Sequence, residues 1–148
     1  VRGFSWGDWG LSSPKLMLDS AVFAERSFLA WLRLKRGHFE VYVSPIVYAE
    51  TALWYMYVGI GVEALERDLE ALGAEVPPIT REAAKLAAEA AYANRRLLPF
   101  RHHARDYIIG AQAALLGADV VTLNKKHFSW LKRVKALTPW ELVKLHTE

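Results

Sequence analysis

The chain has 148 residues, of which 53% are hydrophobic and 24% charged, with a formal net charge of +3, so it can bury the single core of one domain. It contains no cysteine, which excludes disulfides, thiolate metal sites and thiol nucleophiles and leaves oxygen and imidazole as ligands for any metal ion. Because no stretch reaches the roughly 18 apolar residues of a membrane span and no signal peptide opens the chain, we expect a cytoplasmic protein that does not enter the membrane.

The first expected elements are an irregular lead-in, a strand and a helix. Residues 1–14 place glycine, serine and proline around two tryptophans, and residues 15–148 form the expected domain. A short apolar strand is expected at residues 16–18, and apolar positions then repeat with helical spacing from Ser20 to Gly37. The domain therefore begins as a strand followed by a helix.

A second strand and helix follow. Residues 39–43 alternate as in a strand, and Ser44-Pro45 favours a helix start, because the serine oxygen can accept from free amides and proline fits the first turn. This helix passes Glu50 and reaches an apolar run at residues 54–57. A helix that is apolar all round is buried or meets another subunit, so this run is expected in the core, in a homodimer or on a protein partner.

The later elements complete an alternating pattern. Helices at residues 62–72 and from Thr80 are expected to pair as an outer hairpin. The elements expected after them are a helix from Ala104 to Gly117, a strand at residues 119–123, a short strand at residues 134–137 and a helix from Thr138. Strands that alternate with helices predict the α/β class, as a three-layer α/β/α sandwich around a mainly parallel sheet.

Four polar side chains fall where such a sheet binds ligands. Asp19 and Asn124 directly follow strands, Glu50 lies early in the helix after the second strand, and Asp106 begins the helix that leads into the strand before Asn124. Ligands of parallel α/β sheets bind beyond the carboxyl ends of the strands, so this topology can bring the four residues to one edge. Carboxylates among apolar residues need a cation, and their meeting would therefore indicate a metal site.

Each of these residues also has a purely structural explanation. Asp19 can cap the first helix, and Asp106 can meet the positive end of its own helix. Glu50 can belong to an exposed stripe, and Asn124 can end a turn. The sequence pattern by itself leaves both interpretations open.

Four segments together resemble the PIN-domain ribonuclease family, especially the small prokaryotic toxins of the VapC type, over about residues 15–145. Their order, spacing and local chemistry agree with that family, although no single one of them is specific. The segments are Leu18-Asp19-Ser20, Ser44-Pro45-Ile46-Val47-Tyr48-Ala49-Glu50, Arg105-Asp106-Tyr107-Ile108-Ile109-Gly110-Ala111-Gln112-Ala113 and Val121-Thr122-Leu123-Asn124-Lys125-Lys126-His127-Phe128.

The resemblance implies a reaction and partners. PIN domains hold Mg²⁺ or Mn²⁺ in an acidic cluster and hydrolyse RNA phosphodiester bonds, and a VapC-type toxin is silenced by a small antitoxin. The resemblance implies that Asp19, Glu50 and Asp106 are the metal-binding and catalytic acids, with Asn124 as a further polar member of the catalytic edge. By the same resemblance, the supporting hydroxyls are those of Ser20 and Thr122.

One departure from the family affects the expected activity. Many relatives supply a fourth acid either at the position of Asn124 or three residues later, where this chain has His127, which can equally be a plain surface residue. Asp119 opens its strand, so it lies at the wrong edge of the sheet to replace this acid. The alternative to a ribonuclease is therefore a weakened PIN module that binds RNA or a protein without cleavage.

Positive charge gathers in the second part of the chain. Residues 1–93 carry nine Lys and Arg against twelve Asp and Glu, whereas residues 94–148 carry ten against four. This basic part can be a solvated surface or can face a polyanion such as RNA. The candidate RNA-binding residues are Arg95, Arg96, Arg101, Arg105, Lys125 and Lys126.

Two other α/β enzyme classes fit the sequence poorly. A phosphoryl-transfer enzyme of the haloacid-dehalogenase type needs a second aspartate two residues after the first, but Ser20-Ala21 follows Asp19. A dinucleotide-binding fold needs a Gly-x-Gly-x-x-Gly turn, which the chain lacks.

Overall fold

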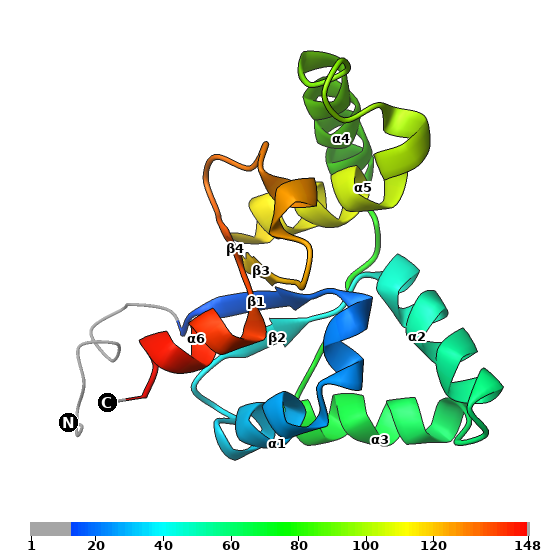
Figure 1. Ribbon diagram of the computed structural model, residues 1–148, viewed down its shortest axis with the longest axis vertical. Helices are drawn as coiled ribbons and strands as arrows, with labels where there is room; N and C mark the ends of the chain where they lie inside the picture. Colours follow the sequence, from blue (N-terminus) through cyan, green and yellow to red (C-terminus); the bar gives the residue numbers. More distant parts are fainter. Residues whose placement is uncertain (1–12, 148) are drawn as a thin grey trace.

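A parallel sheet lies at the centre of the computed structural model, which describes residues 13–147 and so leaves most of the expected lead-in outside the described residues (Figure 1). The strands are β1 (Lys15–Leu18), β2 (Glu40–Tyr42), β3 (Asp119–Val121) and β4 (Ala136–Leu137). They lie in the order β2-β1-β3-β4, and every neighbouring pair is parallel. The predicted parallel sheet is confirmed; β2, β3 and β4 are shorter than the sequence pattern indicated, whereas β1 begins one residue earlier, at Lys15.

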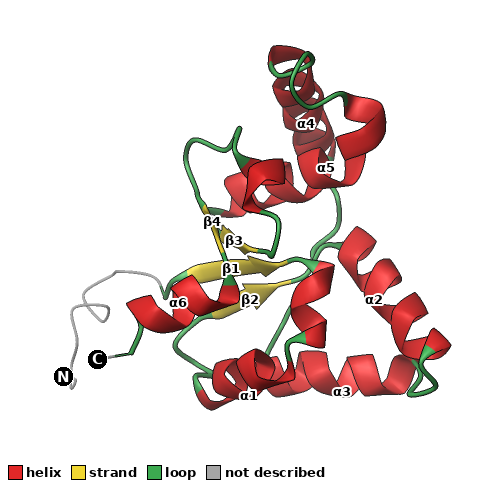
Figure 2. Cartoon of the chain, viewed as in Figure 1, coloured by secondary structure: helices red, strands yellow, loops and turns green. Residues whose placement is uncertain are grey.

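Helices flank this sheet (Figure 2). They are α1 (Arg26–Leu34), α2 (Pro45–Tyr57), α3 (Val62–Leu72), α4 (Arg81–Ala93), α5 (Phe100–Leu116) and α6 (Pro139–Leu145), with 3-10 helices η2 (Ser20–Ala24) and η3 (Lys125–Phe128). Among the described residues, no helix has both the length and the apolar character needed to cross a membrane.

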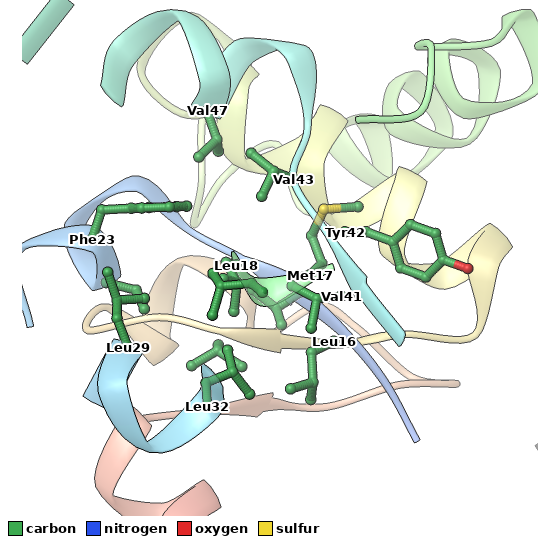
Figure 3. Close-up of a cluster of buried hydrophobic side chains, with 14 of the residues drawn as sticks. Leu16, Met17, Leu18, Phe23, Leu29, Leu32, Val41, Tyr42, Val43 and Val47 are labelled. Atoms are coloured by element: carbon green, nitrogen blue, oxygen red, sulfur yellow. The ribbon is translucent and has the colours of Figure 1, made fainter. Parts of the chain in front are cut away.

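Strand β1 is covered on both faces of the sheet. Successive side chains of a strand point to opposite faces, and Leu16, Met17 and Leu18 are all buried. Figure 3 shows these side chains in one core with Leu32 of α1 and Val47 of α2. Helix layers on both faces confirm the predicted α/β/α sandwich.

Local capping chemistry sets several helix starts. The Ser44 hydroxyl accepts a hydrogen bond from the Ile46 amide (3.2 Å), and Pro45 occupies the first turn of α2. Thr80 caps α4 by accepting from the amide of Ala83 (3.1 Å), and Thr138 forms a capping box at the start of α6. The predicted starts of these three helices are therefore confirmed.

Two helices differ from their predicted boundaries. The segment after β1 is a 3-10 turn, η2, and the α-helix begins only at Arg26, because the Asp19 carboxylate accepts from the Ser20 amide and the chain turns tightly there. Helix α5 begins at Phe100, before the predicted start at Ala104, and has non-helical backbone angles at His103 (φ −131°, ψ 17°). This irregularity lies three residues before Asp106 in the sequence.

The expected hairpin between α3 and α4 is wrong. The two helices lie at opposite ends of the molecule, and α4 packs instead on α5 (Figure 1). Small alanines of α4 such as Ala87 share a buried cluster with Tyr107 of α5. The link between α3 and α4 is held on β2, since the amide of Glu75 donates to the carbonyl of Val41 and the amide of Val43 donates to the carbonyl of Glu75, both at 2.9 Å. The pairing with β2 carries the chain away from α3.

A close contact joins α5 to the segment that follows β3. A Cβ atom built on Gly110 of α5 would lie 2.5 Å from Cζ2 of Trp130, closer than real side chains approach. The Trp130 indole also donates to the carbonyl of His127 (3.2 Å). Gly110 therefore makes room for the tryptophan that holds η3 against α5.

Substitution Gly110→Ala tests this contact. In a free helix interior this change stabilises by up to about 1 kcal/mol, but here the added methyl group overpacks against Trp130 and should lower the free energy of unfolding by about 1–3 kcal/mol. Urea unfolding measures the effect. In a Trp130→Leu background the same change should be neutral or stabilising; an equal penalty in both backgrounds would contradict the contact.

Candidate functional site

The carboxylate of Asp19 is fixed where β1 and β3 end. The Asp19 amide continues the strand pairing by donating to the carbonyl of Val121 (2.9 Å). Its buried side chain accepts from the Ser20 amide at Oδ1 and from the Thr122 hydroxyl at Oδ2, both at 2.8 Å. Because two hydrogen bonds satisfy the carboxylate, Asp19 is held rigidly at the carboxyl edge of the sheet.

Glu50 from α2 and Asp106 from α5 meet Asp19 at one guanidinium group. Arg105 donates to Oδ1 of Asp19 (2.6 Å), to both carboxylate oxygens of Glu50 (2.7 Å each) and to Oδ1 of Asp106 (2.6 Å). We call Asp19, Glu50 and Asp106 the acidic cluster. The alternation of strands and helices thus brings three distant acids to one edge.

The electrostatics of the acidic cluster depend on Arg105. Burial opposes the charge of Arg105, but Glu50 and Asp19 outweigh burial and raise the pKa of the guanidinium above its ordinary value. Burial also raises the pKa of the Asp106 carboxyl, and Arg105 and His127 act against this rise. Three carboxylates share one guanidinium, so the cluster has more acidic groups than basic ones and can accept a further cation.

The donor set of the acidic cluster fits a hard divalent cation. Mg²⁺ and Mn²⁺ prefer carboxylate oxygens, and the three acids already place oxygens around one positive group. The guanidinium of Arg105 lies among those oxygens, so it and a metal ion would compete for them. The Arg105 side chain is 30% exposed, which gives it a route outward to solvent.

Asp106 also faces two histidines with its second oxygen. Its Oδ2 atom lies 3.2 Å from Nδ1 of His127 and 3.7 Å from Nδ1 of His103. Neither histidine is a ligand predicted from the sequence. The spacing of His103 and Asp106, three residues apart on a helix, was the available signal, whereas the approach of His127 depends on the packing of η3.

The other site residues from the sequence analysis lie around this cluster. Ser20 lies beside the acidic cluster, and its hydroxyl oxygen accepts from Nη2 of Arg105 (3.4 Å). Asn124 is exposed, and its backbone amide donates to the Thr122 hydroxyl (3.0 Å). Among the described residues, the Asn124 side chain makes no hydrogen bond to the acidic cluster. It therefore does not take the place of a fourth acid in this conformation.

The candidate RNA-binding residues differ in their surroundings. Arg96, Arg101 and Lys126 are exposed. Arg95 is exposed and stacks its guanidinium on the Tyr92 ring, 4.1 Å from the ring centroid. Three of these residues lie on the turn between α4 and α5 or at the start of α5, the helix that carries Asp106 (Figure 1).

Two candidate RNA-binding residues already have acidic partners. Lys125 forms an ion pair with Glu141 of α6 (2.9 Å). Arg105 directs its guanidinium into the acidic cluster, so in this conformation it points at carboxylates. RNA contact by these two side chains stays a prediction that requires each to leave its partner.

Comparison with known proteins identifies a family and a fold. The model of the family described as PIN domain matches residues 17–136. Similar solved structures include a toxin-antitoxin complex from Klebsiella pneumoniae (18% identity, TM-score 0.64, 85% of this chain and 98% of the matched chain) and FitAcB from Neisseria gonorrhoeae (23%, 0.62, 84% and 98%). VapBC2 from Rickettsia felis, bound to a promoter DNA fragment, is also similar (18%, 0.63, 84% and 98%). A comparison with curated proteins finds no match.

Substitution Arg105→Gln tests whether the guanidinium holds the place of a metal ion. Without it, the three carboxylates have no internal cation, so Mg²⁺ should bind at least about tenfold more tightly, and the free energy of unfolding in EDTA should fall. Isothermal titration calorimetry and thermal unfolding measure the two effects. Arg101→Gln, at an exposed position of the same helix, should change neither, and an unchanged Mg²⁺ affinity in Arg105→Gln would contradict the competition.

Proposed function

Because the chain belongs to the PIN domain family, we propose that it is a metal-dependent endoribonuclease that hydrolyses RNA phosphodiester bonds. One observation carries the proposal: Asp19, Glu50 and Asp106 converge on a single cation at the carboxyl edge of the sheet. A network that only stabilised the fold would not need three carboxylates around one guanidinium. The arrangement suits a site that exchanges an internal cation for a metal ion.

In the proposed reaction the three acids would hold Mg²⁺ or Mn²⁺. The bound ion would neutralise the scissile phosphate and lower the pKa of a water molecule. Thr122 fixes the Asp19 carboxylate, and the adjacent Ser20 amide fixes its other oxygen. The side chain of Glu50 is 38% exposed, the most open of the three acids, so it is the one that can take a proton from water at the mouth of the site.

The substrate would approach from the basic side of the site. RNA is a polyanion, and exposed cations attract it without regard to sequence. Arg96, Arg101 and Lys126 are free to meet phosphates in the present conformation, because they are exposed and the structure gives them no acidic partner among the described residues. Arg105 would join them once a metal ion takes its place among the carboxylates.

A protein partner is the second part of the proposal. The similar structure from Klebsiella pneumoniae is described as a toxin-antitoxin complex, and we propose that this chain is likewise a toxin of a type II system, silenced by a small antitoxin. The second half of α2 and the residue that follows it expose a run of large apolar side chains that suits an antitoxin or a second copy of the chain. These side chains are Leu53, Trp54, Met56, Tyr57 and Val58.

A second candidate function is a PIN module that binds RNA or a protein without cleavage. It is favoured by the missing fourth acid, since Asn124 is exposed and His127 occupies the remaining side of Asp106. Fewer carboxylates bind a divalent ion more weakly. The two functions differ in one measurable property, the metal-dependent cleavage of RNA.

Cleavage of single-stranded and structured RNA by the partner-free protein with Mg²⁺ or Mn²⁺ tests the proposal. Asp19→Asn removes a metal-binding carboxylate and should reduce the rate at least about 100-fold. The matched control is Asp119→Asn, because this carboxylate lies at the opposite end of β3, where it accepts from the Lys135 amide (3.0 Å). Control activity should stay within about threefold of the wild type.

Equal cleavage by the wild type and Asp19→Asn would show that the acidic cluster is not the active site. Failure of the wild type to cleave any RNA, combined with RNA binding that survives in Asp19→Asn, would support the binding module instead.

A further inference from the structure

The two oxygens of Asp106 face different surroundings. Oδ1 accepts from Arg105 inside the acidic cluster, whereas Oδ2 points to the imidazoles of His103 and His127. One candidate ligand atom from each of His103, Asp106 and His127 lies within 4.8 Å of the others. We call these three residues the histidine cluster, which borders the acidic cluster and shares only Asp106 with it.

The histidine cluster contains a nitrogen atom without a partner. Nδ1 of His103 is buried and has no hydrogen-bond partner among the described residues, since its distance of 3.7 Å from Asp106 is too long. Burying a polar atom without a partner costs free energy. A metal ion between the three residues would give this nitrogen a ligand role and remove the cost.

The two imidazoles are held beside each other by separate elements. Their ring centroids lie 5.1 Å apart with an interplanar angle of 77°. His103 occupies the irregular position inside α5, and the carbonyl of His127 accepts from the indole of Trp130, which itself packs on Gly110 of the same helix. The backbone around both histidines is therefore fixed by packing before any ion binds.

We propose that His103, Asp106 and His127 bind a divalent transition-metal ion such as Zn²⁺ or Co²⁺. Two imidazole nitrogens and one carboxylate oxygen are typical ligands of these ions, whereas Mg²⁺ prefers oxygen alone. Nitrogen and oxygen atoms that bind one tetrahedral zinc ion lie about 3.4 Å apart. The ligand atoms of the histidine cluster, which lie within 4.8 Å of one another, therefore need to move only slightly closer together. The His127 side chain is 40% exposed and can rotate to make this movement. This inference requires no RNA cleavage.

Titration of the full chain with Co²⁺ tests the histidine cluster, with visible absorption and calorimetry as readouts. The wild type should bind Co²⁺, and His103→Asn and His127→Asn should each weaken binding at least about tenfold. The matched control is His102→Asn, since His102 is the exposed neighbour of His103 on α5, and this variant should bind as the wild type does. In imidazole nitrogen spectra, Zn²⁺ should shift the signals of His103 and His127 but not those of His102.

The proposal is overturned if the wild type binds no Co²⁺, if the two histidine variants bind it as tightly as the wild type, or if Zn²⁺ leaves the ring signals of His103 and His127 unmoved. Asp19→Asn separates this inference from the proposed nuclease. It should reduce RNA cleavage at least about 100-fold, yet Co²⁺ should still bind and its binding should still weaken on His103→Asn, because Asp19 supplies no ligand atom to the histidine cluster. Loss of Co²⁺ binding in Asp19→Asn would place the ion in the acidic cluster and overturn the histidine site alone.

Discussion

Three carboxylates that share one edge of a sheet need a cation between them, and Arg105 is the cation that the chain supplies. Asp19 and Asp106 are buried, so their mutual repulsion is poorly screened by water. The guanidinium contacts all three acids and thereby ties the end of β1 to α2 and α5. Both the stability of this edge and the metal binding that we propose for it follow from this one arrangement.

The parallel sheet makes the convergence possible. Asp19 follows β1, and the Thr122 hydroxyl that holds it follows the neighbouring strand β3. Helix α5, which bears Asp106, packs on both strands, and α2, which bears Glu50, packs on η2 directly after Asp19. Asp106 belongs to both clusters, because one of its oxygens contacts Arg105 in the acidic cluster and the other faces the imidazoles. A hard ion and a transition-metal ion would therefore each draw on this residue.

Features set by neighbouring residues were predictable from the sequence, and features set by distant packing were not. Ser44 and Thr138 predict the helix starts that follow them, because their side chains cap backbone amides within three residues. The sequence shows the charge of Arg105 but not where its side chain points, so it predicts only a contact with RNA. Its partners Asp19 and Glu50 lie 86 and 55 residues away along the chain. The approach of His127 depends on η3 packing against α5, which no local pattern reveals.

We propose that the acidic cluster exchanges Arg105 for a divalent metal ion. A crystal structure of the protein soaked in Mn²⁺, with anomalous scattering recorded for manganese, tests it most directly. The account predicts a manganese peak within about 2.0–2.6 Å of oxygens from Asp19, Glu50 and Asp106, with the Arg105 guanidinium moved out of the cluster. Arg105 still bound to all three carboxylates, with no manganese among them, would contradict it.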